Sequence, residues 1–152
     1  MHPHEALVRR FYACLAARDP EGAAACYHAD VFFSDPLFPR LRGEAAVDLW
    51  RMRLESETTG AVRLLEVSAD AEAAIACWSL QEDFRGRTVV THGRAMFAFR
   101  GDRISRHYDH FSLWRWISRA FGPAGAALGW FGPFRWAVRR RAARALERFQ
   151  CR

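Results

Sequence analysis

The sequence contains no lysine, no CxxC pair and no long apolar run, and each absence argues against a class of protein. All 23 basic residues are arginine, which is more typical of biased codon usage than of phosphate recognition. The four cysteines, at 14, 26, 77 and 151, are scattered, so we expect reduced thiols and neither a zinc ribbon nor a redox motif. No apolar segment reaches the roughly 18 residues of a membrane-spanning helix.

The composition indicates one globular domain that does not need disulfide bonds. The chain has 152 residues, of which 51% are apolar, so it is long enough to bury a core and too apolar to be disordered. The first residues, Met1 to Glu5, lead directly into a helical pattern and lack the features of a signal peptide. We therefore predict a cytoplasmic protein. His2 and His4 lie too close to the terminus to predict a metal site, and we expect neither a metal nor an organic cofactor.

Three helices followed by four strands predict an α+β fold over residues 1–113. Apolar residues recur at helical spacing from Glu5 to Arg18, and Asp19-Pro20 closes this helix and caps a short alanine-rich one. A third helix starts at Gly43-Glu44 and ends near Thr58-Thr59-Gly60. Four antiparallel strands follow, separated by turn residues, over 62–67, 74–84, 88–100 and 104–113. The helices must cover one face of a curved sheet, because neither layer buries its apolar side alone.

Residues 114–152 are predicted to form a separate, basic and helical extension. Residues 113–152 hold nine Arg and one Glu, a net charge of +8, whereas the whole chain carries +6. Two Gly-Pro pairs, Gly122-Pro123 and Gly132-Pro133, divide the extension into short helices. One face of the last helix is apolar, with Phe134, Val138, Ala142, Ala145 and Phe149. The other face carries Arg135, Arg139, Arg140, Arg141, Arg144 and Arg148.

Two interpretations of this extension are open. Its four tryptophans and its arginine row suit a segment at an anionic lipid surface. Alternatively, the aromatic residues pack over the open mouth or outer face of the sheet, or form a dimer contact, while the arginines are solvated. The Gly-Pro breaks favour the second interpretation, because a free surface helix is usually continuous. No recognition motif accompanies the charge, so we do not expect nucleic-acid binding.

Asp35 is the clearest candidate for a reactive carboxylate. It follows the apolar run Val31-Phe32-Phe33 and precedes Pro36, which lacks a backbone donor and biases Asp35 toward extended backbone. This places one acid at the edge of an apolar environment, where a carboxylate can serve as a general base. The triplet Ser34-Asp35-Pro36 also forms ordinary turns, and from the residues alone the turn is the more common outcome.

The segment from Tyr27 to Pro36, YHADVFFSDP, is followed by Arg42-Gly43 at the start of a helix. Together with the order of elements, it resembles the nuclear transport factor 2-like superfamily, the cone-shaped fold of ketosteroid isomerases, limonene epoxide hydrolases and SnoaL-like polyketide cyclases. The resemblance covers residues 5–113. In the isomerases the Asp before the proline is the catalytic base, so the resemblance implies this role for Asp35.

The same resemblance indicates what the chain lacks. In the isomerases, a tyrosine of the first helix and an aspartic acid of the penultimate strand donate hydrogen bonds to the enolate oxygen. The matching positions are Phe11 and Ala95, which cannot donate. Tyr12 is adjacent, but one helical step is expected to turn it about 100 degrees away from the pocket. Asp109 resembles the last-strand member of the epoxide hydrolases' Asp-Arg-Asp set, whereas Cys77-Trp78-Ser79 stands in place of their Arg-x-Asp.

Strand alternation places His107 and Asp109 on one face of the last strand. If this face is concave, as the resemblance implies, Asp35, His107 and Asp109 converge on one cavity, and His107 is a candidate proton shuttle that works with Asp35 or with Asp109. Alternatively, His107 and Asp109 pair with Arg94 or Arg106 near the rim and have structural roles.

We therefore predict a cavity that binds a small apolar ligand. Its expected lining residues are Phe11, Tyr27, Phe32, Trp50, Trp78, Ala95, Phe97 and Phe111. The first hypothesis is an enzyme acting on a small carbonyl, epoxide or polyketide-like substrate, with Asp35 as general base and His107 and Asp109 as acid or orienting groups. The second is a non-catalytic binder of an acyl or isoprenoid ligand, whose basic extension docks to a membrane or partner. A homodimer is expected in both cases, because open sheets of this kind often bury their outer face by dimerising.

Overall fold

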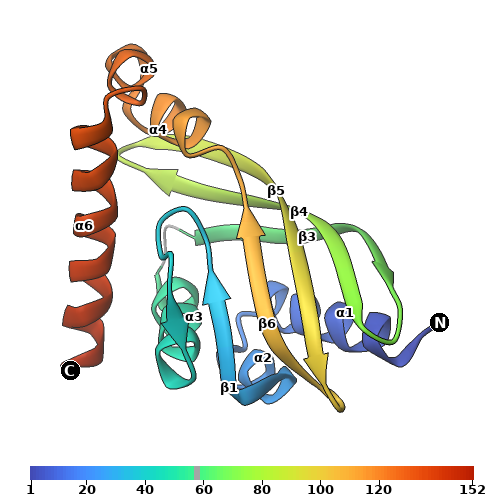
Figure 1. Cartoon of the computed structure of the whole chain (residues 1–152). Coiled ribbons are helices and arrows are strands. Elements are labelled where there is room, and N and C mark those ends of the chain that lie inside the picture. Colours follow the sequence, from blue (N-terminus) through green and yellow to red (C-terminus); the bar gives the residue numbers. More distant parts are fainter. Residues whose placement is uncertain (57–58) are drawn as a thin grey trace.

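The computed structural model describes residues 1–56 and 59–152 and confirms the α+β class (Figure 1). Its elements are α1 (Pro3–Ala16), α2 (Pro20–Cys26), β1 (Tyr27–Ser34), β2 (Leu41–Arg42), α3 (Glu44–Glu55), β3 (Thr59–Ala69), β4 (Ala73–Phe84), β5 (Arg87–Arg100), β6 (Arg103–His110), α4 (Leu113–Phe121), α5 (Pro123–Leu128) and α6 (Gly132–Gln150). Six strands form one curved sheet in the order β2-β1-β6-β5-β4-β3. β1 runs parallel to β6, and all other neighbouring strands are antiparallel.

Local signals set the ends of the helices. The Asp19 side chain caps α2 by accepting the backbone N–H of Gly22 at 2.9 Å, and Pro20 takes the first helical position, as predicted. α1 ends at Ala16, before the predicted Arg18, because Arg18 adopts left-handed backbone with φ 56°. α3 starts after Gly43 as predicted and ends at Glu55. This is earlier than the predicted end near Thr58-Thr59-Gly60: Thr59 and Gly60 already belong to β3, and Thr58 lies outside the described residues.

The sheet has two more strands than the predicted meander of four. β3, β4, β5 and β6 correspond to the predicted strands, although β6 ends at His110 because Leu113 already begins α4. β1 and β2 add to the sheet beside β6. The parallel pairing of β1 with β6, in which Phe33 lies opposite His107, joins residues far apart in the sequence. A local pattern cannot reveal such a pairing.

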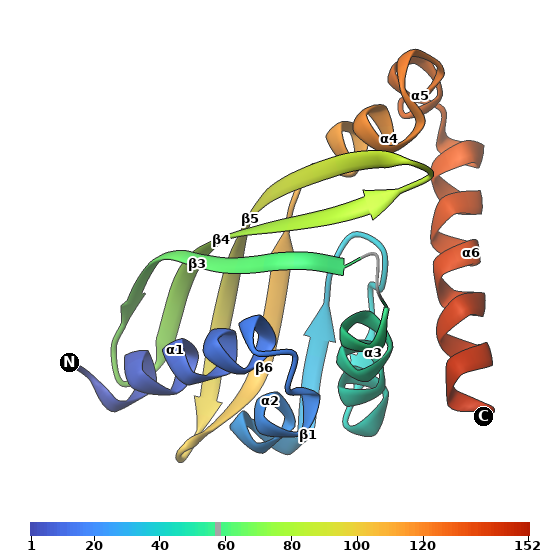
Figure 2. The ribbon, with the colours of Figure 1, turned by 180° about the vertical axis from the view of Figure 1, so that it is seen from behind.

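The apolar core lies between the three N-terminal helices and the concave face of the sheet (Figure 2). Its largest fully buried residues come from α1, β1, α3, β6 and α4; they include Phe11, Leu15, Phe33, Leu49, Ile104 and Ile117. Burying one such side chain contributes about 2 kcal/mol to folding. The convex face is more open, since Ile75 and Met96 there are half exposed.

The extension packs against the end of the sheet, but the packing interpretation describes only part of it: Trp116 is buried, whereas Trp130 and Trp136 are exposed. α4 packs on β5, and α6 stands beside α3 (Figures 1 and 2). The predicted Gly-Pro breaks begin α5 and α6. Leu146 of α6 is buried. Arg139 was predicted on the solvent face, but it is half-buried, and its Nε donates to the carbonyl oxygen of Pro36 at 2.8 Å.

The C-terminal end of α6 is also fixed to α3. Gln150 Nε2 donates to Asp48 Oδ2 at 3.2 Å, and Arg152 Nη1 pairs with Glu55 Oε1 at 2.7 Å. Of the helices that the structure describes, none has both the length and the apolar character to cross a membrane.

Candidate functional site

A cavity of about 400 Å³ lies between the concave face of the sheet, the helices α1 and α3, and the inner side of α6. Apolar side chains form most of its wall, and its size suits a small organic ligand. Its large aromatic residues are Phe38, Trp50, Trp78, Phe84, Phe111 and Trp116. Its polar residues are Tyr12, Asp35, Arg53, Ser56, Glu82, Thr91 and Asp109. The extension completes the wall, because Trp116, Ala142 and Ala145 belong to α4 and α6.

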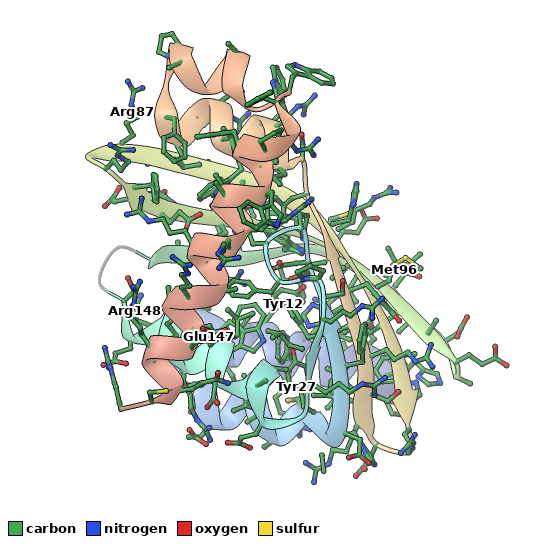
Figure 3. The ribbon with its side chains drawn as sticks, turned by 60° about the vertical axis from the view of Figure 1, so that its left-hand side comes forward. Tyr12, Tyr27, Arg87, Met96, Glu147 and Arg148 are labelled. Carbon is green, nitrogen blue, oxygen red and sulfur yellow. The ribbon has the colours of Figure 1, made fainter. Side chains whose placement is uncertain are left out.

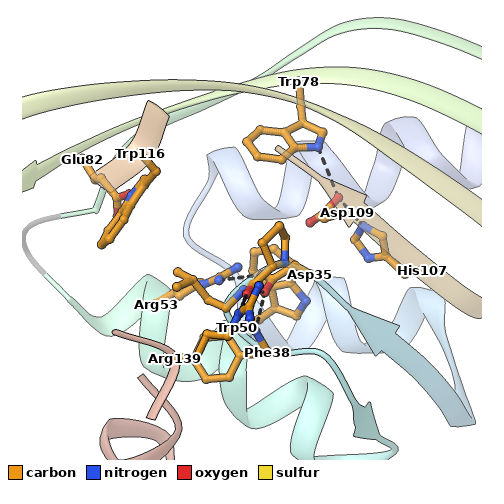
Figure 4. Close-up of polar contacts among 12 residues, drawn as sticks. Asp35, Phe38, Trp50, Arg53, Trp78, Glu82, His107, Asp109, Trp116 and Arg139 are labelled. Atoms are coloured by element: carbon orange, nitrogen blue, oxygen red, sulfur yellow. Dashed lines mark hydrogen bonds and ion pairs between the residues drawn. The ribbon is translucent and has the colours of Figure 1, made fainter. Parts of the chain in front are cut away.

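Asp35 lines this cavity and also forms the predicted turn. Its Oδ1 accepts the backbone N–H groups of Leu37 at 2.8 Å and Phe38 at 2.6 Å, and its own N–H donates to the Phe38 carbonyl oxygen at 3.0 Å. Its Oδ2 accepts from Arg53 Nη2 at 2.9 Å (Figure 4). Only 1% of the Asp35 side chain is exposed. Both carboxylate oxygens therefore already have donors.

The Arg53 guanidinium holds this carboxylate from inside the cavity. It also lies over the Trp50 and Phe38 rings, at 5.2 and 5.5 Å from their centroids, so the cation is packed between aromatic faces. Its side chain is 21% exposed. Sequence reasoning missed Arg53, because its partner lies 18 residues earlier and only the folded turn brings the two together.

Replacing Arg53 with Met should lower the free energy of unfolding by about 2 kcal/mol at neutral pH, because it leaves the buried Asp35 charge without its cation. Urea unfolding measures the effect. Arg63→Met on exposed β3 is the matched control and should change stability by less than about 0.5 kcal/mol. Asp35→Asn combined with Arg53→Met should recover part of the loss. Equal destabilisation by both Arg variants would contradict the pairing.

Asp109 is held differently from Asp35. Its Oδ1 accepts from His107 Nε2 at 3.0 Å and from Trp78 Nε1 at 3.2 Å (Figure 4). Within residues 1–56 and 59–152, no group donates to its other oxygen, Oδ2. The side chain lines the cavity and is 7% exposed. Asp109 thus has one fixed oxygen and one oxygen available to a ligand.

A buried chain of hydrogen bonds, on the side of Asp109 away from the cavity, orients its side chain. Trp50 Nε1 donates to the Tyr27 hydroxyl at 2.9 Å, and that hydroxyl lies 2.7 Å from His107 Nδ1. We assign the Tyr27 proton to the bond with Nδ1, which leaves the His107 proton on Nε2, facing Asp109. Because His107 is fully buried, it positions Asp109 and does not reach a ligand.

Aromatic rings enclose His107. Phe97 stacks on it at 4.4 Å between ring centroids, while Phe11 and Phe33 contact it edge-on at 5.4 and 5.0 Å. The alternative prediction, that His107 and Asp109 pair with Arg94 or Arg106, differs from the structure. His107 instead pairs with Tyr27 and Asp109, and Asp109 pairs with Trp78 and His107.

Tyr12 lines the cavity, contrary to the expectation that it turns away (Figure 3). Phe11 points instead into the core, where it is fully buried. Burial and then the negative charge of Asp109 raise the pKa of Tyr12 well above its usual value near 10. Tyr12 therefore keeps its proton and can donate a hydrogen bond to a ligand near Asp109.

The buried tyrosines predict a loss of stability at alkaline pH. Burial also raises the pKa of Tyr27, although the hydrogen bond from Trp50 opposes this. The folded chain keeps both phenolic protons, whereas the unfolded chain releases them near pH 10. The contribution of these two tyrosines to stability should therefore be constant below about pH 10 and fall above it by about 1.4 kcal/mol per pH unit per tyrosine. Urea unfolding between about pH 9 and pH 11 measures the slope.

Two phenylalanine variants test this assignment. Tyr27→Phe should halve the alkaline slope, whereas Tyr108→Phe, at the 39% exposed Tyr108, should leave it unchanged. If neither variant changed the slope of stability against pH above about pH 10, the assignment of this slope to the buried tyrosines would be wrong.

The structure brings only part of the predicted lining to the cavity. Trp50, Trp78 and Phe111 line it as predicted. Four other predicted lining residues lie in the core behind this wall: Phe11, Tyr27, Ala95 and Phe97. Phe32 is on the opposite face, where Arg42 covers its ring and Tyr108 contacts it at 5.7 Å. The run Val31-Phe32-Phe33 is apolar at every position, so alternation alone could not decide which residue points inward.

Gly93 makes room for the indole that holds Asp109. Gly93 of β5 lies opposite Trp78 of β4, and a Cβ atom there would be 2.2 Å from Trp78 Cζ2. Any larger residue must displace the indole. A glycine inside a strand is a known signal of such a close approach. The described residues contain no group of three or more His, Cys, Asp or Glu side chains that could hold a metal ion.

Comparison with known proteins agrees with this architecture. The profile of the SnoaL-like domain family matches residues 8–107, which end before α4. No curated protein matches the chain by sequence. An NTF2-like protein of unknown function from Burkholderia pseudomallei is 20% identical, with a TM-score of 0.68 over 79% of this chain and 98% of its own.

Two further solved structures carry names that refer to an activity. A candidate polyketide cyclase from Xanthomonas campestris pv. campestris is 23% identical, with a TM-score of 0.67 over 78% of this chain and 96% of its own. An LEH-like epoxide hydrolase from M. tuberculosis is 19% identical, with a TM-score of 0.67 over 83% of this chain and 93% of its own. At these identities the likeness concerns the fold, and it confirms the predicted NTF2-like cone.

Proposed function

The chain belongs to the SnoaL-like domain family, and we propose that it is an isomerase or cyclase that removes a proton next to a carbonyl group of a small apolar substrate. In this proposal Asp109 is the general base. Tyr12 donates a hydrogen bond to the carbonyl oxygen, and the aromatic wall of the cavity holds the carbon skeleton. The names of related structures, among them a candidate polyketide cyclase, are compatible with this reaction class.

The hydrogen-bonding state of Asp109 carries the proposal. A general base needs an oxygen that can reach the substrate proton. Asp109 Oδ2 meets this requirement, since His107 and Trp78 engage only Oδ1 and so fix the direction of Oδ2. Asp35, which the sequence predicts as the base, has donors on both oxygens. We therefore give Asp35 the role of holding Arg53 and the turn at the cavity wall.

The reaction uses only a proton and an electron pair. Asp109 Oδ2 takes a proton from the carbon next to the carbonyl group; the C–H electron pair forms a C=C bond, and the π pair of the C=O bond moves to the oxygen to form an enolate. Tyr12 stabilises this oxyanion by its hydrogen bond. An isomerase then returns the proton from Asp109 to another carbon. A cyclase instead forms a carbon–carbon bond from the enolate to a second carbonyl carbon of the same molecule; the π electrons of that C=O bond move to its oxygen, which takes the proton from Asp109.

Deuterium exchange tests the proposal without knowledge of the product. Enolisable cyclic ketones and 1,3-diketones are incubated with the protein in D₂O, and NMR measures the loss of the proton next to the carbonyl group. The proposal predicts exchange well above the buffer rate for at least one ketone that fits the cavity of about 400 Å³. Exchange at the buffer rate across ketones that demonstrably bind would reject it.

A non-catalytic binder is the second candidate. It is favoured by the residues at the two positions where the isomerases carry their oxyanion donors. Phe11 and Ala95 are both fully buried and cannot donate, so Tyr12 is left as the nearby tyrosine donor. Native mass spectrometry discriminates the two candidates, since a binder should retain an apolar ligand through purification. Under either function, the cytoplasmic location and the homodimer remain predictions. A dimer would bury exposed residues of the convex face such as Ile75 and Met96.

A further inference from the structure

Three large aromatic side chains are exposed where α5 passes into α6. Trp130 is 74% exposed, Phe131 57% and Trp136 59%. They lie within seven residues of one another, next to the Gly132-Pro133 break that starts α6. Soluble proteins seldom leave several large aromatic residues exposed in one place unless the place binds something. This aromatic corner has no role in the cavity, whose wall does not include it.

The outer side of α6 adds a row of unpaired positive charge. Arg140, Arg141, Arg144 and Arg148 are exposed, and in the part of the chain that the structure describes none of them forms an ion pair. The Arg140 guanidinium lies 5.1 Å from the Trp136 ring centroid, which joins this arginine row to the aromatic corner. Glu147 is the single acidic residue of α6.

The apolar side of α6 is already occupied by the body of the protein. Leu146 is buried, and Ala142 and Ala145 line the cavity. Binding through the outer side would therefore not require α6 to leave its place. The surface differs in this respect from an amphipathic helix that inserts its apolar face into a bilayer.

We propose that the aromatic corner and the arginine row form a docking surface for an anionic lipid bilayer. Indole and phenyl rings favour the headgroup region of a bilayer, and arginine pairs with lipid phosphate through its planar guanidinium. Each basic residue close to an anionic membrane contributes about 1 kcal/mol to binding. The acyl region of a bilayer can receive the aromatic rings, and the lipid phosphates can pair with the arginines. The bilayer surface is flat, so it can contact the outer side of α6 and the aromatic corner at the start of this helix at the same time.

Docking in this orientation would place one wall of the cavity next to the membrane, because α6 has the arginine row on one side and cavity residues on the other. The inference does not depend on the reaction proposed above. Membrane binding and proton transfer can be measured separately, and failure of one leaves the other intact.

Co-sedimentation with vesicles tests the docking surface. The full chain should bind vesicles of equimolar phosphatidylglycerol and phosphatidylcholine at low salt. Its binding to vesicles of pure phosphatidylcholine should be much weaker. Replacing Arg140, Arg141 and Arg144 with Gln should lower the partition coefficient more than tenfold, given about 1 kcal/mol for each charge. Replacing Trp130, Phe131 and Trp136 with Ala should also weaken vesicle binding. The binding that remains should depend more strongly on salt concentration, because it rests on the arginines alone.

The matched control removes the same charge from another surface. Arg63, Arg94 and Arg106 are exposed on β3, β5 and β6, and replacing them with Gln should leave vesicle binding within about threefold of wild type. A wild-type readout needs no variant: brominated lipids should quench the tryptophan fluorescence on binding. The proposal would be overturned by equal binding to both vesicle types, or by an equal loss of vesicle binding in the control variant. Absence of quenching, or binding to duplex DNA in preference to vesicles, would also overturn it.

Discussion

Replacing Asp109 with Asn is expected to lower the rate of deuterium exchange into a bound ketone by about 10³-fold, within the range for loss of a general base. Asn keeps the shape of Asp and still offers Oδ1 to His107 and Trp78, but its amide cannot accept the substrate proton. Binding of the ketone should change much less than the rate. Single-turnover exchange measured by NMR, together with calorimetric binding, separates the two effects.

The control for this variant is Asp102→Asn. Asp102 is an acidic residue of the β5–β6 turn whose side chain is 94% exposed, so its replacement should leave exchange unchanged. A slow Asp109→Asn variant that also loses ketone affinity by the same factor would point to a damaged cavity. Retained exchange would exclude Asp109 as the base.

The second large effect is expected for Tyr12→Phe. Removing one donor from an oxyanion site typically costs about 10²- to 10³-fold in rate, and Phe preserves the packing of the ring. The raised pKa of Tyr12 predicts that its contribution persists up to and beyond about pH 10, because the phenol keeps its proton there. A rate profile of wild type and Tyr12→Phe from about pH 7 to pH 10 measures both effects.

Phenol binding provides a second readout for Tyr12. Phenolates resemble the enolate, so a series of substituted naphthols should bind wild type more tightly than Tyr12→Phe, while the matching apolar naphthalenes bind both equally. Tyr108→Phe on the convex face is the matched control. Equal affinity of all three proteins for the naphthols would mean that Tyr12 does not contact the oxygen.

The sequence predicts the fold well where the signal is local. Asp19-Pro20 and the two Gly-Pro pairs mark helix boundaries through the chemistry of proline and capping, and the structure has boundaries at each of them. The strands β3 to β6 are separated by short turns that the sequence also marks. β1 is harder to find, because its parallel pairing with β6 depends on residues some 75 positions away.

The site was only partly predictable for the same reason. Asp35, Asp109, Trp50, Trp78 and Phe111 are found at the cavity as expected. Whether Tyr12 or Phe11 faces the cavity depends on how α1 packs against β3 and β4, and the helical spacing of apolar residues does not fix this rotation.

Sequence reasoning also could not assign the hydrogen bonds of the carboxylates. The donors of Asp35 come from its own turn and from α3, and those of Asp109 come from β4 and β6. The types of residue identify candidate acids. Only the packed structure indicates which oxygen remains available to a ligand.

The central claim, that Asp109 is the base, is tested most directly by comparing Asp35→Asn with Asp109→Asn in one exchange assay on one ketone. Asn at position 35 still accepts the Leu37 and Phe38 amides, so the variant should fold and lose less than tenfold in rate, whereas Asp109→Asn should lose about 10³-fold. The reverse order, with exchange abolished by Asp35→Asn and retained by Asp109→Asn, would contradict the claim and return the role of base to Asp35.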